Sequence, residues 1–490
     1  MVSMSFSDLA SGLVDIPSSL ADVSLVDLVL DSRQVTSGSG FIAVEGTQTD
    51  GRRFISDALD RGASVVLAES GKAANLDPRV VSMQGLRQHV GALAQRFYGD
   101  PSQKLTLLAV TGTNGKTSIS DYIAQLLRLL GESAGTIGTL GARTRSGEAV
   151  ASQNTTPDII SLNRQLADWV ERGVGFAAIE ASSHALDQNR LDGLTIHTGI
   201  FSNLTRDHLD YHESMAAYQR AKFRLFEEFQ PENILYNADD ENTYRARGFA
   251  SRSALGVSLR DALADVYVQV LSEDGSGLSL QLHSPFGSAT VATKVHGRFN
   301  AFNVTVAMMA VCGLGFSFRD VAAAASYLQA VDGRMQAVGG GEDIRVFVDY
   351  AHTPDALESA LFALNASCSG ELWVVFGCGG DRDSGKRAEM GRIASDLASK
   401  IVITNDNPRT EDASAIAKEI LSGCGDKDVV IDLDRATAID FAIRSARSSD
   451  TVLIAGKGHE SYQIVGVTEH LFSDVDQARQ ALAARGVADA

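Results

Sequence analysis

A lysine and a threonine stand where an apolar segment gives way to a glycine-containing turn. Leu105–Val110 predicts a fully buried strand, and Thr111-Gly-Thr-Asn-Gly-Lys-Thr117 follows it directly. Glycine lets backbone amides approach an anion closely, Lys116 adds a positive charge, and Thr117 carries a hydroxyl that can bind Mg²⁺. Apolar residues at helical spacing come next. The segment therefore predicts a phosphate-binding loop at a helix N-terminus.

The match to the general phosphate-loop pattern is imperfect, because Val110 stands where a first glycine is expected. The alternative interpretation is a glycine-rich turn between a strand and a helix, with no ligand. Strand, turn, Lys-Thr pair and amphipathic helix occur in the right order, which favours the phosphate loop. The loop residues predicted to contact a nucleotide are Thr111, Gly112, Thr113, Asn114, Gly115, Lys116, Thr117 and Ser118.

Three further side chains could bind a metal ion or carry out chemistry. Glu180 follows the apolar run Phe176–Ile179, and a carboxylate at the carboxyl end of a parallel strand points into the ligand crevice, where it could hold Mg²⁺. His208 follows another apolar run, and Lys222 lies in a predicted helix. The alternatives are a solvated glutamate, a structural histidine and a surface lysine.

The bulk properties exclude several classes of protein. The chain has 490 residues, enough for about three domains, and 44% of them are hydrophobic. A net charge of −18 argues against a nucleic-acid binder. No segment predicts a membrane span or a signal peptide, and the four cysteines lack metal-ligand or disulfide spacing. We expect a cytoplasmic protein that does not bind membranes.

The elements that must position these residues predict an α/β fold with three domains. Residues 1–102 form a small N-terminal α/β domain, 103–337 a central domain with a parallel sheet like that of P-loop ATPases, and 338–490 a Rossmann-like domain. In the last domain strands alternate with helices, which predicts a doubly wound sheet. Its strands are predicted at Arg345–Asp349, Leu372–Phe376, Lys400–Thr404, Val429–Ile431 and Thr451–Ala455.

The glycine loop resembles that of the Mur ligases and of the folylpolyglutamate synthases, which use ATP to join an amino acid to a carboxylate. Strings in all three segments match the Mur ligases in the family's order, and Asp406-Asn-Pro-Arg409 resembles the members that add meso-diaminopimelate. The resemblance implies an ATP-dependent ligase that joins this amino acid to UDP-N-acetylmuramoyl-L-alanyl-D-glutamate (UDP-MurNAc-L-Ala-D-Glu) through an acyl phosphate. This reaction belongs to peptidoglycan precursor synthesis.

The same resemblance implies the substrate and nucleotide contacts. Asn300, Arg334 and Asp349 are expected at the nucleotide. The residues expected at the UDP-linked substrate are Leu30, Ser32, Thr47, Gln48, Thr49, Asn154, Thr155, Thr156, Ser182, Gln188 and Arg190.

The family resemblance also implies the catalytic groups, which are Lys116, Glu180, His208 and Lys222. Thr117 and Glu180 would hold one Mg²⁺, while His208 and Lys222 would hold a second. In the family this lysine is carbamylated to N6-carboxylysine, which turns a cation into an oxygen ligand suited to Mg²⁺. Carbamylation needs an amine that can lose its proton, which burial or a nearby cation promotes.

The diaminopimelate contacts implied by the resemblance are Arg382, Asp406, Asn407, Pro408, Arg409, Gly456 and Glu460. Arg409 can grip the distal carboxylate of diaminopimelate through two charge-assisted bonds, and Glu460 would take the distal ammonium. Lysine has only an ammonium at that end and would meet a like charge.

Two other functions stay open at this stage. A lysine-adding or glutamate-adding ligase of the same superfamily would discriminate little against lysine. A non-catalytic nucleotide switch would hydrolyse ATP without the UDP-linked substrate. We expect a monomer that acts on small molecules only.

Overall fold

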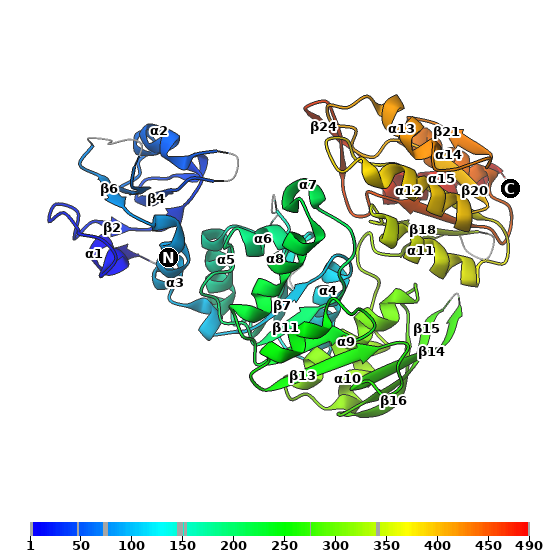
Figure 1. Cartoon of the computed structure of the whole chain (residues 1–490), viewed down its shortest axis with the longest axis horizontal. Helices are drawn as coiled ribbons and strands as arrows, with labels where there is room; N and C mark the ends of the chain where they lie inside the picture. Colours follow the sequence, from blue (N-terminus) through cyan, green and yellow to red (C-terminus); the bar gives the residue numbers. More distant parts are fainter. Residues whose placement is uncertain are drawn as a thin grey trace.

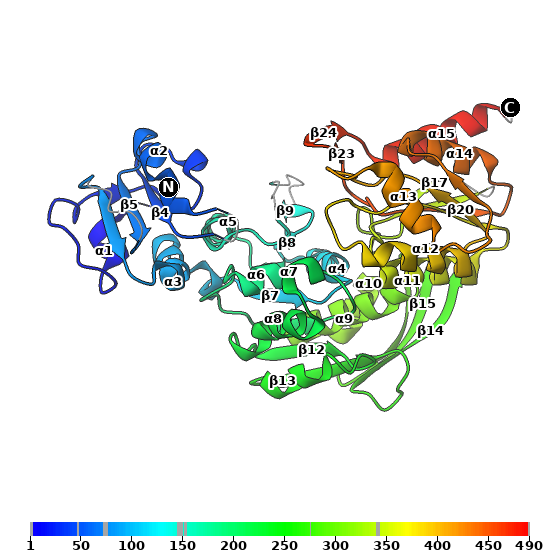
Figure 2. The ribbon, with the colours of Figure 1, turned by 45° about the horizontal axis from the view of Figure 1, so that its top comes forward.

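The three larger β-sheets of the described residues, with four, ten and six strands, follow one another along the chain, each in its own lobe (Figure 1). The computed structural model describes residues 3–46, 49–71, 77–144, 150, 154–274, 276–339 and 344–488. In both views the N-terminal and C-terminal lobes lie on either side of the central lobe, so that the molecule forms an arc (Figures 1 and 2). Among the described residues, no helix combines the length and the apolar composition that a bilayer crossing requires.

The N-terminal lobe is a parallel four-stranded sheet with short helices. Its strands are ordered β3 (Asp27–Val29), β4 (Ser39–Ala43), β5 (Val65–Glu69) and β6 (Val80–Met83). The short elements are β1 (Met4–Ser5), α1 (Phe6–Ala10), β2 (Ser24–Leu25), η1 (Ser32–Gln34), η2 (Gly51–Phe54), α2 (Ile55–Asp60) and η3 (Pro101–Gln103). The small α/β domain predicted from the sequence is thus confirmed in its fold.

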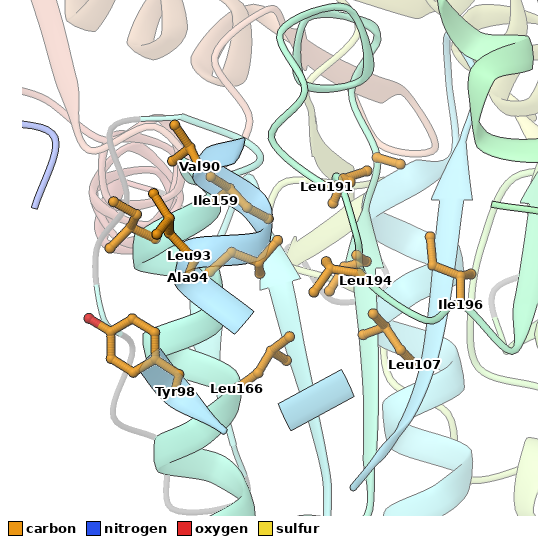
Figure 3. Packing of buried hydrophobic residues seen from close by; sticks show 14 of the residues in the cluster. Val90, Leu93, Ala94, Tyr98, Leu107, Ile159, Leu166, Leu191, Leu194 and Ile196 are labelled. Atoms are coloured by element: carbon orange, nitrogen blue, oxygen red, sulfur yellow. The ribbon is translucent and has the colours of Figure 1, made fainter. Parts of the chain in front are cut away.

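Helix α3 (Leu86–Tyr98) joins the N-terminal lobe to the central one. Its apolar residues, including Val90 and Leu93, share a core with Ile159 and Leu166 of α5 (Ile159–Glu171), as Figure 3 shows. Arg164 of α5 donates to the Leu28 carbonyl at 2.7 Å. The two lobes therefore share buried apolar surface as well as polar contacts.

The central sheet has the strand order β16-β15-β14-β13-β12-β11-β7-β10-β8-β9. Its strands are β7 (Thr106–Thr111), β8 (Ala134–Gly138), β9 (Gly141–Arg143), β10 (Phe176–Glu180), β11 (Thr198–Phe201), β12 (Asn233–Asn237), β13 (Ser253–Ser258), β14 (Val266–Asp274), β15 (Gly277–Ser284) and β16 (Gly287–Thr293). Its helical elements besides α5 are α4 (Lys116–Leu129), α6 (Ser183–Asp187), α7 (Leu209–His212), α8 (Met215–Glu227), η4 (Tyr244–Phe249), α9 (Phe299–Gly313) and α10 (Phe318–Ala325).

Burial on both faces explains why β7 reads as a continuous apolar run. Leu107 and Ala109 face the core that contains α5 and α8, whereas Leu108 and Val110 face the core that contains α4 and α9. The expected parallel sheet is confirmed at its centre. The edges differ, because β9 and the β14–β16 meander pair antiparallel and the sequence analysis did not predict the meander.

The C-terminal sheet has the strand order β17-β18-β22-β19-β20-β21 and is parallel except for β17. Helices cover both faces, which confirms the doubly wound fold. The strands are β17 (Gln336–Gly339), β18 (Arg345–Asp349), β19 (Leu372–Phe376), β20 (Lys400–Ile403), β21 (Val429–Ile431) and β22 (Thr451–Ala455), followed by a hairpin of β23 (Tyr462–Val465) and β24 (Thr468–Leu471). The helices are α11 (Pro354–Ser367), α12 (Gly385–Leu397), α13 (Ala413–Leu421), α14 (Arg435–Ser445) and α15 (Asp474–Ala488).

Candidate active site

The predicted phosphate loop lies between β7 and α4, and two of its glycines are required by the backbone. Gly112 has φ 144°, and a Cβ there would lie 1.9 Å from the Ser202 hydroxyl. Gly115 has φ 88° and precedes the first residue of α4, where a Cβ would lie 2.8 Å from Asn303 Oδ1. Only glycine combines these conformations with such close neighbours.

A half-buried lysine and a fully buried one converge on one carbonyl of this loop. Lys116 Nζ donates to Gly112 O at 2.9 Å and to Thr113 O at 2.8 Å, while Lys222 Nζ donates to Gly112 O at 2.7 Å. Burial lowers the pKa of Lys116. Burial, followed by the nearby Lys116 charge, also holds the pKa of Lys222 well below its usual value. Lys222 lies 4.4 Å from the ring centre of Tyr218.

Glu180 stands at the end of β10 and is buried among hydroxyl and amide donors. Its carboxylate accepts from Thr117 Oγ1 at 3.1 Å, from the Thr139 amide at 2.8 Å and from the Thr139 hydroxyl at 3.1 Å. Thr117 in turn accepts from Arg334 at 3.1 Å. The two residues predicted to hold one Mg²⁺ are therefore in direct contact.

His208 lies near the two lysines in a left-handed backbone conformation, with φ 53°. Its Nε2 is 3.3 Å from Asp207 Oδ2, and its ring centre is 6.1 Å from that of Tyr218, the residue that also contacts Lys222. Burial lowers the pKa of His208 to about 3, so that the imidazole is neutral and can act as a ligand.

The oxygen donors around Glu180 match part of what Mg²⁺ requires. Among the described residues, no three His, Cys, Asp or Glu side chains gather as a ready-made metal cluster. Mg²⁺ is commonly held by one or two carboxylates together with phosphate oxygens and water, and Thr117 with Glu180 supplies such a partial shell. The residues fit Mg²⁺ that binds together with a nucleotide.

The predicted nucleotide residues outside the loop lie at its edge. Asn300 donates to His296 O at 2.7 Å and accepts from Asn303 at 2.9 Å. Asn303, which the sequence analysis missed, is the side chain next to Gly115. The signal that could have indicated Asn303 is its spacing of three residues from Asn300, which places both on one face of α9.

Arg334 and Asp349 fix the connection between the central and C-terminal lobes. The Arg334 guanidinium lies 4.4 Å from the ring centre of Tyr350. Asp349 accepts from the backbone amides of Met335 at 2.6 Å and Ala351 at 2.8 Å, and burial raises its pKa. Each carboxylate oxygen of Asp349 thus accepts one hydrogen bond from a backbone amide.

The predicted residues for the UDP-linked substrate fall into two groups. In the central lobe, Thr156 donates to Glu180 O at 2.6 Å and accepts through its carbonyl from Arg190 at 2.8 Å. Gln188 accepts from Arg190, and Ser182 Oγ lies 3.2 Å from Thr156 Oγ1. Thr155 accepts from Thr139, and Asn154 precedes it in the chain.

The second group belongs to the N-terminal lobe. Leu30 and Ser32 follow β3, and Thr49 lies in the loop after β4, so these residues share the carboxyl edge of the parallel sheet. Thr47 and Gln48 lie outside the described residues.

The predicted diaminopimelate residues gather at the carboxyl ends of β19, β20 and β22. Arg409 has φ 51°, donates from Nη1 to Gly380 O at 2.8 Å and is fixed by its amide, which donates to Ile464 O at 3.1 Å. A Cβ at Gly379 would lie 2.9 Å from Arg409 Nη1 and 3.8 Å from Arg382 Cγ. The fold therefore brings the two arginines together.

Next to the arginines lies a buried polar group. Asn407 donates to Glu460 Oε2 at 2.9 Å, and Lys457 donates to the same oxygen at 2.7 Å. Asp406 accepts from the Asn407 amide at 2.7 Å, and a Cβ at Gly456 would lie 2.6 Å from Asp406 Oδ2. Pro408 follows in the same loop. The sequence analysis did not include Lys457 as a site residue, although it lies between the predicted residues Gly456 and Glu460.

Contacts between lobes connect the two ends of the site. Asn114 of the phosphate loop donates to Asp355 of α11 at 2.8 Å, and Arg206 pairs with Asp383 at 3.2 Å. A cleft of about 380 Å³ opens between the lobes, lined by Leu209, Asp210, Asp381, Arg382, Asp383 and Ser384. Arg382 thus faces a cleft whose other wall belongs to the central lobe.

Three family profiles cover most of the chain in order. "Mur ligase family, catalytic domain" matches residues 27–98, "Mur ligase middle domain" matches residues 110–311, and "Mur ligase, glutamate ligase domain" matches residues 333–458. The chain belongs to the Mur ligase family, whose members are ATP-dependent ligases.

Two curated relatives bear the name of the same enzyme. A protein of Pseudomonas aeruginosa named UDP-N-acetylmuramoyl-L-alanyl-D-glutamate--2,6-diaminopimelate ligase is 44% identical over 473 residues, which cover 96% of this chain and 97% of the relative. A protein of Haemophilus ducreyi with the same name is 42% identical over 483 residues, covering 94% and 96%.

Solved structures agree with the fold. A structure of a ligase with the same name is 35% identical, with a TM-score of 0.70, and covers 99% of this chain and 100% of its own. MurF ligase from Thermotoga maritima in complex with ADP is 18% identical, with a TM-score of 0.65, covers 95% and 98%, and supports the fold alone.

Proposed function

We propose that this chain uses ATP to join meso-diaminopimelate to UDP-MurNAc-L-Ala-D-Glu in peptidoglycan precursor synthesis. The observation that carries the proposal is the group at the ends of β19, β20 and β22, where Arg382 and Arg409 lie beside the Asn407–Glu460 pair. A guanidinium suits the distal carboxylate of diaminopimelate, and a carboxylate suits its distal ammonium. Relatives that match nearly the full length bear the name of this activity.

The phosphate loop would prepare the acyl group. A carboxylate is a poor electrophile, so an oxygen of the D-glutamate side-chain carboxylate attacks the γ-phosphorus and ADP leaves. The amine of diaminopimelate then attacks the acyl carbon, phosphate leaves, and the amine proton passes to solvent. Lys116 and the loop amides position the phosphates and neutralise their charge, which is the main task of a protein in phosphoryl transfer.

Thr117 and Glu180 are the proposed holders of one Mg²⁺, and His208 with Lys222 of a second. Bound Mg²⁺ would neutralise charge on the phosphate oxygens. The direct contact of Thr117 with Glu180 and the position of His208 and Lys222 around Tyr218 support these pairs.

Carbamylation of Lys222 is part of the proposal. The side chain is 1% exposed, and burial beside Lys116 favours a neutral amine. A neutral amine adds CO₂ with loss of a proton, so that the nitrogen gains a carboxylate. The product would be N6-carboxylysine, whose oxygens suit Mg²⁺.

The remaining parts of the proposal concern the other substrate and the whole molecule. Thr156 donates to the Glu180 carbonyl and is hydrogen-bonded to Ser182 and Arg190, and these three residues with Gln188 and Thr155 would bind the muramoyl-peptide end. The UDP end would be bound by Leu30, Ser32, Thr47, Gln48 and Thr49, and the peptide end also by Asn154. ATP would be bound by Asn300, Arg334 and Asp349.

For the whole molecule we propose three domains, at 1–102, 103–337 and 338–490. We also propose a monomer that acts in the cytoplasm, where ATP is available.

A ligation assay with purified protein tests the proposal. ATP, Mg²⁺ and UDP-MurNAc-L-Ala-D-Glu are supplied with meso-diaminopimelate or L-lysine, and the product is measured by mass spectrometry. We expect ligation of meso-diaminopimelate with kcat/KM at least about 100-fold above that for L-lysine, because the arginines would meet a like charge. Equal use of both would indicate another amino-acid specificity. ATP hydrolysis independent of the UDP-linked substrate would indicate a nucleotide switch.

A further inference from the structure

Lys457 is a buried lysine of the C-terminal lobe that the proposed reaction leaves without a role. Its side chain has no exposed surface, and Nζ donates to Glu460 Oε2 at 2.7 Å and to Asn407 Oδ1 at 3.1 Å. Asn407 Nδ2 donates to the same Glu460 oxygen at 2.9 Å. The three side chains form a closed triangle of hydrogen bonds.

The triangle fixes the orientation of the Asn407 amide. Oδ1 accepts from two donors, Lys457 Nζ and the Ile464 amide at 2.9 Å. With its oxygen held in this way, the amide must turn its NH₂ group toward Glu460. Loss of Lys457 would remove one of the two donors that set this orientation.

The triangle also divides the Glu460 carboxylate into two unlike oxygens. Oε2 receives both donors, whereas Oε1 has no hydrogen-bond partner within the described residues, and the side chain is 14% exposed. Oε1 is therefore the oxygen available to a ligand. Burial raises the pKa of Glu460, and the Lys457 ammonium is the strongest influence that opposes the rise.

We propose that Lys457 is a positioning residue for amino-acid specificity, which orients Asn407 and Glu460 so that Oε1 accepts the distal ammonium of the incoming amino acid. This inference rests on the proposed function. Because Lys457 is enclosed by protein, it acts on the ligand through Glu460 and not by direct contact.

The test compares Lys457→Met with the wild-type enzyme in the ligation assay. Met keeps the length and apolar stem of the side chain but removes the charged donor. We expect the KM for meso-diaminopimelate to rise at least about 10-fold, the size expected for a lost hydrogen bond to a charged group, while the KM for ATP stays within about 2-fold. Lys427→Met is the matched control, because Lys427 lies in the same lobe and donates to the Ala398 carbonyl at 3.0 Å.

A double-mutant cycle separates positioning from a merely structural role. If Lys457 acts through Glu460, then Lys457→Met should add little to the KM change of Glu460→Gln, because the two residues act as one unit. Without the Lys457 charge, burial alone should raise the pKa of Glu460 further. In Lys457→Met, the KM for meso-diaminopimelate should therefore fall as the pH rises and Glu460 loses its proton. The additional substitution Glu460→Gln should abolish that pH dependence.

Three results would overturn the inference: an unchanged KM in Lys457→Met, fully additive losses in the cycle, or an equal effect of Lys427→Met. If Lys457→Met unfolds at assay temperature, Lys457→Gln keeps a neutral donor and should give the same pattern at smaller size. Failure of the proposed function is distinguishable, because the wild-type enzyme would then not ligate meso-diaminopimelate at all.

Discussion

Each end of the site contains one buried lysine, Lys222 in the central lobe and Lys457 in the C-terminal lobe, and the two ends compensate their positive charge in different ways. In the central lobe Lys116 and Lys222 donate to carbonyls of the glycine loop, and neither forms a salt bridge within the described part of the chain. In the C-terminal lobe Lys457 is paired with Glu460 at 2.7 Å. The first end leaves its lysines without a carboxylate partner, whereas the second pairs its buried lysine with Glu460 and leaves Arg382 and Arg409 bonded to backbone carbonyls.

This difference matches the ligands that each end would receive. A triphosphate brings several negative charges, so unpaired basic groups bound only to carbonyls suit it. The distal head of diaminopimelate carries one ammonium and one carboxylate, so a region that offers both signs suits it. The net charge of −18 indicates neither the unpaired lysines nor the region of mixed charge, because the local arrangement of charges decides what each end binds.

The largest expected effect comes from removing the unpaired charge at the phosphate end. Lys116→Ala should lower kcat by about 1000-fold, because loss of a preorganised cation at a phosphate forfeits stabilisation in a buried site. Phosphate release in the presence of both substrates measures it. Lys294→Ala, which removes an exposed lysine of the same lobe, is the control. A loss of kcat below about 10-fold would contradict the proposed role of Lys116 as the cation that neutralises the phosphates.

The second lysine should respond differently because its proposed role is to carry a carboxylate. Lys222→Ala should lower kcat by about 100-fold or more, and added formate or acetate should restore part of the activity by occupying the vacated space. The same additions should leave Lys116→Ala inactive, which makes that variant the matched control. Full activity without additions would remove carbamylation from the mechanism.

At the amino-acid end the effect should be confined to one substrate. Arg409→Ala should raise the KM for meso-diaminopimelate by about 50-fold, because a charge-assisted bidentate contact is lost, and should change the KM for ATP by less than about 3-fold. Steady-state kinetics with each substrate varied in turn gives both values. Equal increases in the two constants would refute the assignment of Arg409.

The smallest effect is expected at the surface between the lobes. Arg206 and Asp383 form a partly exposed pair at 3.2 Å, with Arg206 50% exposed. Such pairs contribute little, so Arg206→Ala should change kcat by less than about 3-fold. Arg172→Ala, which removes an exposed pair at the C-terminal end of α5, is the control. A loss above about 10-fold would show that this pair, and not the buried groups, governs the site.

Buried strands were the part of the fold that the sequence predicted best. Arg345–Asp349 and Thr451–Ala455 have the predicted bounds because both faces of the doubly wound sheet are covered, which leaves an uninterrupted apolar run. The meander at Val266–Thr293 was not predicted, although its largely alternating buried and exposed positions are typical of antiparallel strands with one covered face.

The candidate site was predictable where a functional residue follows a strand. Glu180 and Lys116 were predicted in this way, because strand ends define the crevice of an open α/β sheet, and their roles stay predictions. Asn303, Asp355 and Lys457 were not found, since their roles depend on contacts with residues distant in sequence, such as the bond between Asn114 and Asp355. Local pattern carries no information about such pairs.

A crystal structure of the enzyme with a non-hydrolysable ATP analogue, Mg²⁺ and meso-diaminopimelate tests the central claim most directly. The contrast in charge compensation predicts phosphate oxygens in contact with Lys116, and the distal carboxylate and ammonium of the amino acid on Arg409 and Glu460 Oε1. Phosphates bound away from the glycine loop, or a distal head bound away from Arg409, would contradict it.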